Sequence, residues 1–539
     1  MKIMKSKINK NLGFNNLSMG KKFALIPVFL LISIASSFAQ TVISDVKRVY
    51  LQNIKAITEN DEVKGYYAFA KTDKTKGKDK IYSLTIMDLN LDVINTVEIG
   101  KGNNIISLES SYNGDAFCFS FLNFNKKVIE YVILDKKGET EGTYTTERLS
   151  NSEMNYMNTL LPSEDYPYSG GIIAVPGEGF VRYGMEKEGG WRYIMEMINN
   201  KGKKEWEATS GDDNKKAYEW AKPMFANQNT IVTMVNSRNK MLDEGKVYCV
   251  FTDVKTGEAI FKTEVESEDG KYLYQPIGIS FDNNTKEFFL YGEYFKTNKD
   301  KVVKGNSLGL YFQDISSKGT VKTENFASWT DDISKVLKVD SKGRMEGGLS
   351  LAIHNMIRMP DGKIFAIGEQ YKKALNAGAI AMGMLAGGSN TSMIQIELHD
   401  MVIIEFDDKM SIESAKTFKK AITDVPLPTG YEMMNLPMIG FILKSYGLFN
   451  YNFTQISPDK KEFSCAYTNC DRKGKDDKES SNFIVGSITY DGSELKLDKV
   501  RLPNKPSDFI VMPGKPGYVA LMEYYYKKKV IEFSLQKLD

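Results

Sequence analysis

Histidine is scarce in this sequence, and its scarcity excludes several common kinds of catalytic site. The 539 residues include only two histidines, His354 and His399, so a metal site built on three histidines cannot form. A Ser-His-Asp triad would have to use one of this pair. The sequence also lacks a Gly-x-Ser-x-Gly turn, a P-loop, a zinc-protease helix motif and an EF-hand loop. We therefore expect no cofactor and no metal, and we favour a non-catalytic role while leaving an enzymatic one open.

Cysteine is also rare, and the four present do not indicate a disulfide framework. Cys465 and Cys470 are five residues apart, which corresponds to about 16 Å along an extended strand. A disulfide needs Cα atoms within about 7 Å, so this pair is bridged only if the strand ends between them. Cys118 and Cys465 lie in apolar, strand-like stretches, where we expect buried free thiols.

An excess of charge of one sign is absent, which argues against a nucleic-acid partner. The chain has 71 Lys and Arg against 69 Asp and Glu. Six lysines and no acidic residues lie in residues 1–39, so removing this segment would leave a net charge of about −4. A nucleic-acid-binding protein normally has a marked basic excess. We expect no nucleic acid among the partners.

The N-terminus has the pattern of a cleavable signal peptide. A lysine pair precedes an apolar run over residues 23–35, which is too short to span a bilayer. Ser37 and Ala39 then supply the small residues of a cleavage site. We expect a signal peptide over residues 1–39, cleavage near Ala39, and a periplasmic or secreted protein with no transmembrane segment in the mature chain. The alternative is an N-terminal membrane anchor.

What the sequence does contain is a recurring tight turn between short apolar stretches. The turns recur at intervals of about 50–56 residues, with three longer intervals. A period of this size, built from strands and turns, is typical of a β-propeller. The turns lie near Asp61, Asn113, Glu178, Gln228, Asn283, Asp361, Asp459 and Lys515.

A second marker, an Asp or Asn after an apolar strand and a nearby glycine or small residue, alternates with the first. We expect these markers to join the two outer strands of each unit, which makes four antiparallel strands, one propeller blade. The sequence contains eight inner hairpins but only seven outer ones, so the last blade lacks its outermost strand. Residues 41–47 are free to supply that strand and close the ring. The second markers lie near Asp88, Asp135, Asn199, Asp253, Asp314, Asp407 and Asp491.

The predicted fold is therefore an all-β propeller of four-stranded antiparallel blades. Eight blades are favoured and seven are the alternative, because residues 41–57 are short for two strands. Residues 40–539 form a single propeller domain in this interpretation. Repeat architecture allows one domain of this size.

Most long segments are expected on one side of the propeller, which we call the long-loop face. Connections from the second to the third strand, and from one blade to the next, lie on that side of a four-stranded meander. Long loops on a rigid scaffold are where binding sites usually occur. The segments are 148–169, 328–350, 373–400 and 422–449, with the lysine-rich loops 71–80, 296–306 and 471–480.

Two of these segments, 373–400 and 422–449, are apolar inserts with short helices expected near 374–386 and 433–447. Their methionines make them candidates for a partner-docking surface, because methionine-rich surfaces adapt to varied partners. The alternative, which we favour, is that the two inserts pack together as a small accessory core. The methionines concerned are Met382, Met384, Met433 and Met434.

Four further side chains are candidates for a ligand or partner surface. His354 and Arg358 alternate with Met356 along the predicted innermost strand of the sixth blade, so they would share a face toward the central channel. Trp220 and Trp329 lie near blade junctions, where they could stack on a ligand. Ordinary packing is the competing interpretation for all four.

Carboxylates on the long-loop segments leave a glycosidase open, since such an enzyme needs only two carboxylates about 5–9 Å apart. Asp331, Asp332, Asp424 and Glu432 lie in these segments. Nothing in their spacing selects a pair, and solvated loop acids are the ordinary explanation.

A block near the start of the mature chain resembles a known family. Residues 59–69 (Glu-Asn-Asp-Glu-Val-Lys-Gly-Tyr-Tyr-Ala-Phe) and 87–91 (Met-Asp-Leu-Asn-Leu) resemble an uncharacterised family of exported, β-propeller-like Bacteroidota proteins of unknown function. The likeness runs through most of the mature chain. It implies an architecture and a location, and it brings no catalytic residues.

We expect an exported, non-catalytic propeller that binds a protein, peptide or glycan partner through its long-loop face. The first alternative is a carbohydrate-active hydrolase or lyase with carboxylates at the channel mouth. The second is a structural component of a cell-envelope complex. The identity of the partner does not follow from the sequence.

Overall fold

The structure is a computed structural model, in which Ala39–Asp539 form one compact unit. The predicted signal peptide over 1–39, and most of the expected helix at 374–386 with Met382 and Met384, lie outside the described residues, as does Met433. The structure describes residues 40–59, 61–161, 171–210, 217–240, 243, 245–376, 392–427, 432, 434–471, 482–501 and 508–538.

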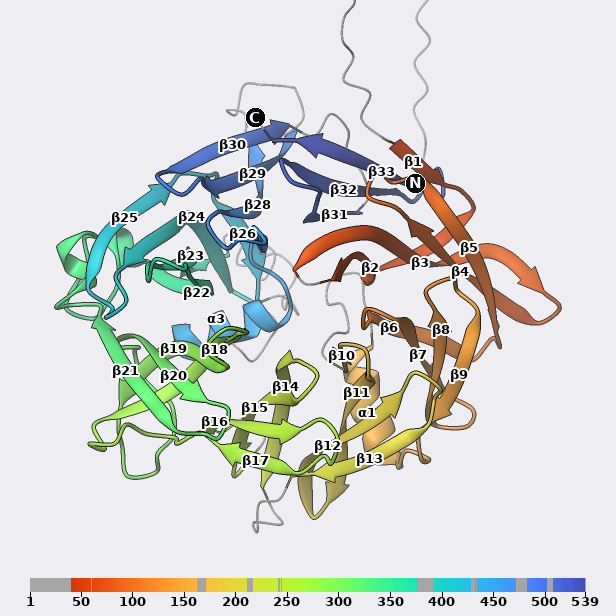
Figure 1. Ribbon diagram of the computed structural model, residues 1–539, viewed down its shortest axis with the longest axis horizontal. Coiled ribbons are helices and arrows are strands. Elements are labelled where there is room, and N and C mark those ends of the chain that lie inside the picture. Colours follow the sequence, from red (N-terminus) through yellow and green to blue (C-terminus); the bar gives the residue numbers. More distant parts are fainter. Residues whose placement is uncertain are drawn as a thin grey trace, which may run out of the picture. The chain divides into compact units, whose positions relative to one another are not determined.

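The chain is all-β, and its strands pair in antiparallel groups of four (Figure 1). Within each group the strands follow one another in sequence order, as a meander. Group 1 comprises β2 (Val46–Glu59), β3 (Glu62–Lys76), β4 (Asp79–Met87) and β5 (Val93–Lys101). Group 2 comprises β6 (Ile105–Tyr112), β7 (Ala116–Asn123), β8 (Val128–Asp135) and β9 (Thr140–Thr145). Group 3 comprises β10 (Ile172–Val175), β11 (Gly179–Glu188), β12 (Gly190–Asn199) and β13 (Lys204–Thr209). Group 4 comprises β14 (Tyr218–Ala226), β15 (Thr230–Arg238), β16 (Lys246–Asp253) and β17 (Ala259–Lys262).

The remaining groups continue the same order. Groups 3 and 4 are joined into one eight-stranded sheet by a single bridge between Trp191 and Tyr218. Group 5 comprises β18 (Tyr272–Asp282), β19 (Glu287–Lys296), β20 (Gly309–Ser316) and β21 (Val321–Ser328). Group 6 comprises β22 (Ser350–Arg358), β23 (Ile364–Leu375), β24 (Ile394–Phe406) and β25 (Ile412–Phe418), and β26 (Thr423–Pro426) also pairs with β24. Group 7 is β27 (Tyr451–Ile456), β28 (Phe463–Asp471), β29 (Asn482–Tyr490), β30 (Leu495–Arg501), and group 8 is β31 (Asp508–Pro513), β32 (Tyr518–Tyr525), β33 (Val530–Lys537) with β1 (Gln40–Ile43).

The first strand of the chain completes the last group. β1 pairs antiparallel with β33, with Thr41 opposite Phe533. The expectation that residues near 41–47 pair with the C-terminal strands is met by Gln40–Ile43. β33 would otherwise be an edge strand with unpaired backbone groups.

Hydrophobic clusters join each group to the next. Phe69 and Tyr82 of group 1, for example, pack on Phe119 and Phe121 of group 2. Similar clusters join the later pairs, and one cluster joins group 8 to group 1. Most of the core therefore lies between sheets, which explains why the strands are apolar on both faces.

Each of the eight predicted inner turns lies between two paired strands, from β2–β3 to β31–β32. Asp61 and Gly114 adopt left-handed φ values of 67° and 96°, which a tight turn requires and few residues tolerate.

The Asp/Asn marker has a simple physical role in the outer turns. The Asp88 carboxylate accepts hydrogen bonds from the backbone N–H groups of Asn90 and Asp92 at 2.8 and 2.9 Å. This Asx arrangement fixes the turn. It recurs at Asp135, Asn199, Asp253, Asp407 and Asp491.

Asp314 departs from this pattern. It lies within β20, and the turn that follows is held by Ser316, whose hydroxyl accepts from the Thr320 N–H at 3.0 Å. The Asp314 carboxylate binds Arg358 instead.

The long segments contain helices that the sequence places only in part. α3 (Leu436–Ser445) lies within the helix expected at 433–447, whereas α1 (Asn151–Leu160) was not predicted. η1 (Ile333–Lys335) and η2 (Glu346–Gly348) are single 3₁₀ turns in the segment before β22. The lysine-rich residues 71–80 are not a loop, because they extend the β3–β4 hairpin.

No helix among the described residues is long and apolar enough to cross a membrane.

Candidate functional site

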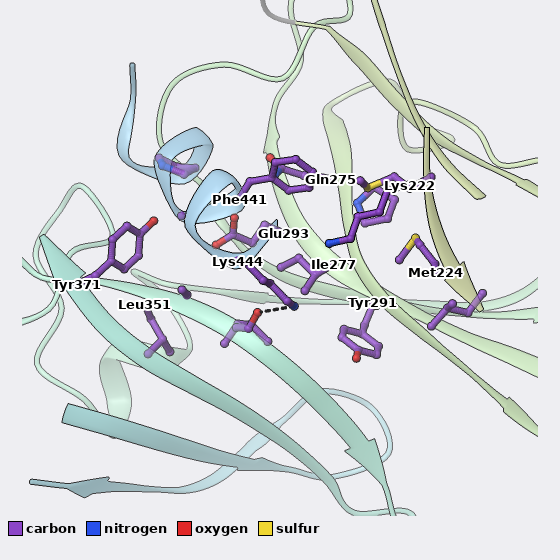
Figure 2. Close-up of a pocket in the computed structure, with 18 of the residues that line it drawn as sticks. Lys222, Met224, Gln275, Ile277, Tyr291, Glu293, Leu351, Tyr371, Phe441 and Lys444 are labelled. Carbon is purple, nitrogen blue, oxygen red and sulfur yellow. Dashed lines mark hydrogen bonds between the residues drawn. The ribbon is translucent and has the colours of Figure 1, made fainter. Parts of the chain in front are cut away.

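A cavity of about 220 Å³ lies where groups 4, 5 and 6 meet α3 (Figure 2). It is lined by Lys222 and Met224 of β14, by the bulged stretch 275–279 of β18, and by the first residues of β22. Phe441 and Lys444 of α3 complete the wall. Of the segments expected on the long-loop face, 422–449 contributes α3 to the cavity wall, and 328–350 ends just before Leu351, another lining residue.

Helix α3 is held in place at its start and along one side. The Asn435 side chain caps it by accepting from the Met438 N–H at 2.9 Å. Tyr371 of β23 donates its hydroxyl hydrogen to the Leu436 carbonyl at 2.9 Å. A Cβ at Gly440 would lie 2.5 Å from the Tyr371 oxygen, so only glycine permits this approach. Ile439 and Leu443 are buried beneath.

Lys444 brings a cation to the cavity from the opposite side to the strands. Its ammonium donates to the Ile353 and His354 carbonyls at 3.1 and 2.9 Å. Its pKa is lowered to about 7, mainly by burial and to a smaller extent by the nearby Lys222, against the opposing effect of Glu293.

Glu293 of β19 is the carboxyl group of the cavity. Glu293 is only 9% exposed, and burial raises its pKa to about 8, against the opposing effect of Lys444. Lys222 is also buried enough for its pKa to fall below the usual value, and its ammonium lies 5.6 Å from the centre of the Phe441 ring.

Among the described residues, two of these three charged side chains have no hydrogen-bond or ion-pair partner. Within the described residues, neither the Glu293 carboxyl nor the Lys222 ammonium forms a hydrogen bond or an ion pair with another side chain or the backbone. Figure 2 shows Lys222, Glu293 and Lys444 around the same space. Buried polar groups normally have partners, so unpartnered ones at a cavity indicate a site for a ligand.

None of these three residues was predicted from the sequence to belong to a site. Glu293 is a charged residue within a buried, largely apolar strand, and Lys444 follows an apolar stretch of helix. A charged residue inside such an apolar run was the available signal, but the three residues come from three different elements, which only the fold brings together.

His354 and Arg358 do not share a face, contrary to expectation. A bulge between Ile353 and Asn355 breaks the alternation of β22. Arg358 points to group 5, where it binds Asp314 at 2.5 and 3.1 Å and its guanidinium lies 4.2 Å from the centre of the Phe289 ring. His354 packs the other way.

His354 belongs to a buried ionic cluster between groups 6 and 7. Its Nε2 lies 3.5 Å from Glu369 Oε2, and its ring stacks on Tyr451 with centres 4.5 Å apart. Glu369 also lies 3.0 Å from the Lys420 ammonium and accepts from the backbone N–H groups of Asn450 and Tyr451. Burial opposes ionisation of Glu369, but His354 and Lys420 outweigh it and hold its pKa below the usual value. This cluster joins two groups.

The remaining candidates have these surroundings. Trp220 packs edge-on against Phe441, with ring centres 5.8 Å apart, beside the cavity. Trp329 is 4% exposed and donates Nε1–H to the Ser307 hydroxyl at 3.0 Å. Met434 packs partly buried near α3.

His399 lies 3.3 Å from Glu397. Asp332 accepts from the Ser328 N–H at 3.0 Å, as part of a local turn. Within the described ranges, no three His, Cys, Asp or Glu side chains are grouped to hold a metal ion. Cys118 and Cys465 are buried and free, as expected, and so is Cys249.

A family model described as a family of unknown function, DUF6770, matches residues 19–539. The chain belongs to this family. The predicted resemblance to an uncharacterised family is confirmed to that extent. No curated protein matches the chain in sequence.

Several solved structures resemble the fold. The β-propeller domain of the Trilobed protease from Pyrococcus furiosus has 11% identity and a TM-score of 0.30, covering 67% of this chain and 94% of that one. Hydrazine synthase from Kuenenia stuttgartiensis has 10% identity and a TM-score of 0.32, covering 79% and 93%. A prolyl endopeptidase has 8% identity and a TM-score of 0.37; the match covers 88% of this chain and 53% of that one. These resemblances concern a β-propeller-like fold alone.

Proposed function

We propose that this protein is an exported, non-catalytic β-propeller that binds a partner through the cavity bordered by Lys222, Glu293 and Lys444. One observation carries the proposal: two charged side chains border this cavity without a direct partner in the described residues. Such groups cost free energy when buried, and a ligand that pairs with them removes the cost.

The proposal includes a closed propeller of eight blades. The support is that four-stranded groups follow one another in the chain, that clusters join each group to the next and the last to the first, and that β1 pairs with β33. Seven blades would require two of these groups to be one blade, and the single bridge between groups 3 and 4 is weak support for that alternative.

The cavity lies near the strand ends that adjoin the long segments, on the expected long-loop face. Leu351 is the second residue of β22, and Tyr371 lies near the end of β23, just before the 373–400 insert. α3 belongs to the 422–449 insert. Binding sites concentrate on such segments, which supports the choice of this face.

Export is the second part of the proposal. It is supported by the lysine pair, the short apolar run and the small residues near Ala39, and by the resemblance to exported Bacteroidota proteins. A periplasmic or secreted location follows from it. The N-terminal residue of the protein recovered from cell fractions tests this directly, and Gln40 is the expected first residue.

The carbohydrate-active alternative finds less support at the cavity. Among the described residues that line it, Glu293 is the one carboxylate, whereas a glycosidase uses two. An envelope-complex role would use the 374–443 region, of which residues 377–391, 428–431 and 433 lie outside the described residues.

Binding can be tested with the mature chain and glycan and peptide libraries. Ala352→Leu adds bulk at the cavity wall, and Val93→Leu makes a similar change at a half-exposed position on β5. We expect a bound molecule that is recovered chemically unchanged, that Ala352→Leu loses and that Val93→Leu retains. Binding that survives Ala352→Leu, or release of reaction products, would contradict the proposal.

A further inference from the structure

We propose that the cavity binds the carboxylate of a small ligand with an apolar body, held between Lys222 and Lys444. This inference rests on the proposed function, because it takes the cavity as the binding site, and it adds the chemical class of the ligand.

The two ammonium groups have donors to spare. Lys444 uses two donors on the Ile353 and His354 carbonyls, and an ammonium has three. Lys222, from a different element, has no hydrogen bond within the described residues. Figure 2 shows both side chains directed toward the space below Phe441. A carboxylate has two oxygens and can accept from both lysines at once.

The balance of charge selects an anion over a cation. Two lysines and one glutamate border the cavity, so a fully ionised site is positive. Glu293, when protonated, becomes an O–H donor and gives a further hydrogen bond to a ligand carboxylate. The cavity walls exclude water in part, which strengthens these charge-assisted bonds.

The rest of the lining sets the size and character of the ligand. Met224, Ile277, Leu351, Tyr371 and Phe441 present apolar surface. The cavity volume of about 220 Å³ equals about seven water molecules. That is enough for one carboxylate on a single aromatic or branched group. A free carboxylic acid and the C-terminal residue of a peptide share this chemistry.

Binding should take up protons. A ligand carboxylate favours protonated Lys444 and disfavours ionised Glu293, so it raises both pKa values from about 7 and about 8. Affinity is then highest below about pH 7 and falls as pH rises through 8. The other titratable groups at the cavity or beside it are Lys222 of β14, Tyr291 of β19, Tyr371 of β23 and His354 of β22, whose ring turns toward Glu369.

Titration calorimetry with four probes tests the inference. The probes are phenylacetate, its amide phenylacetamide, a peptide with a free C-terminal phenylalanine, and the same peptide amidated. We expect an acid to bind about tenfold or more tightly than its matched amide. Repeating the titration in buffers of different ionisation enthalpy should show net proton uptake. Tighter binding of phenylacetate identifies a free acid as the source, and tighter binding of the peptide identifies a C-terminus.

Lys222→Met is the main variant, because Lys222 makes no hydrogen bond that its loss would break within the described fold. It should weaken binding by about tenfold or more, while Lys222→Arg should retain part of the affinity. Lys246→Met removes an exposed lysine of β16 and should leave binding unchanged.

Each other outcome decides against the inference. Equal binding of acid and amide would overturn the carboxylate class while leaving the proposed function in place. Absence of binding by both acids, or unweakened binding to Lys222→Met, would also overturn it. The proposed function itself fails separately, through partner binding that Ala352→Leu does not affect.

Discussion

At the scale of single residues, Glu293 and Lys444 border one cavity, and the pKa of each is shifted toward neutrality for the same reason. Burial disfavours the charged form of each, so the pKa of the acid rises to about 8 and that of the lysine falls to about 7. Groups with such values cluster at functional sites, which is why this pair, and not the two histidines, indicates the site.

Glu293→Gln should make stability less dependent on pH. The folded-state pKa of Glu293, about 8, lies above the unfolded value, so its contribution is complete below the unfolded pKa and is lost as pH rises through 8. Glutamine keeps the shape without the proton equilibrium. In urea unfolding at several pH values, the free energy of unfolding of the variant relative to that of the wild type should increase by up to about 1.4 kcal/mol per pH unit between pH 4.5 and 8. Glu139→Gln, at an exposed position, controls for the lost charge. A stability difference that does not change with pH would contradict the account of Glu293.

At the scale of elements, Glu369 connects β23 to the start of β27. It accepts two backbone N–H groups of group 7 while facing Lys420 and His354, and its side chain is fully buried. Removing one partner from a buried pair leaves the other charge uncompensated.

Glu369→Gln should therefore be strongly destabilising, by about 3–5 kcal/mol in chemical denaturation. Glu405→Gln is the matched control, because it breaks the more exposed pair with Lys363 and should cost about 1 kcal/mol or less. Comparable effects of the two substitutions would mean that burial of the Glu369 cluster has little energetic weight.

Local chemistry explains which elements could be predicted. Most inner turns contain a left-handed residue and most outer turns an Asx acceptor, so Asn113-Gly114 and Asp88 mark their turns in the sequence itself. The bulge at His354 and the contact of Gly440 with Tyr371 depend on distant strands. The cavity could not be predicted because Lys222, Glu293 and Lys444 are far apart in sequence and meet only through packing.

At the scale of the whole molecule, the two ends of the compact unit meet in one sheet. β1, at the start of this unit, pairs with β33, and the cluster of groups 8 and 1 includes Tyr66, Met522 and Phe533. The cohesion of the last group thus depends on residues nearly five hundred positions away.

Replacing residues 40–43 with Gly-Ser-Gly-Ser, at constant length, should lower the melting temperature and promote association. Unpaired β33 would present a free edge to other molecules. Thermal unfolding together with light scattering at several protein concentrations measures both effects. The exposed control Val93→Leu should change neither. A variant with unchanged stability and no greater association than the wild type would show that β1 is dispensable for the fold.

Crystallography of residues 40–539 with 4-bromophenylacetate would show whether the cavity bordered by Lys222, Glu293 and Lys444 binds a carboxylate. We expect an anomalous bromine peak inside the cavity and carboxylate oxygens about 2.7–3.2 Å from both Lys222 Nζ and Lys444 Nζ. Bromine outside the cavity, or a carboxylate turned away from both lysines, would contradict it.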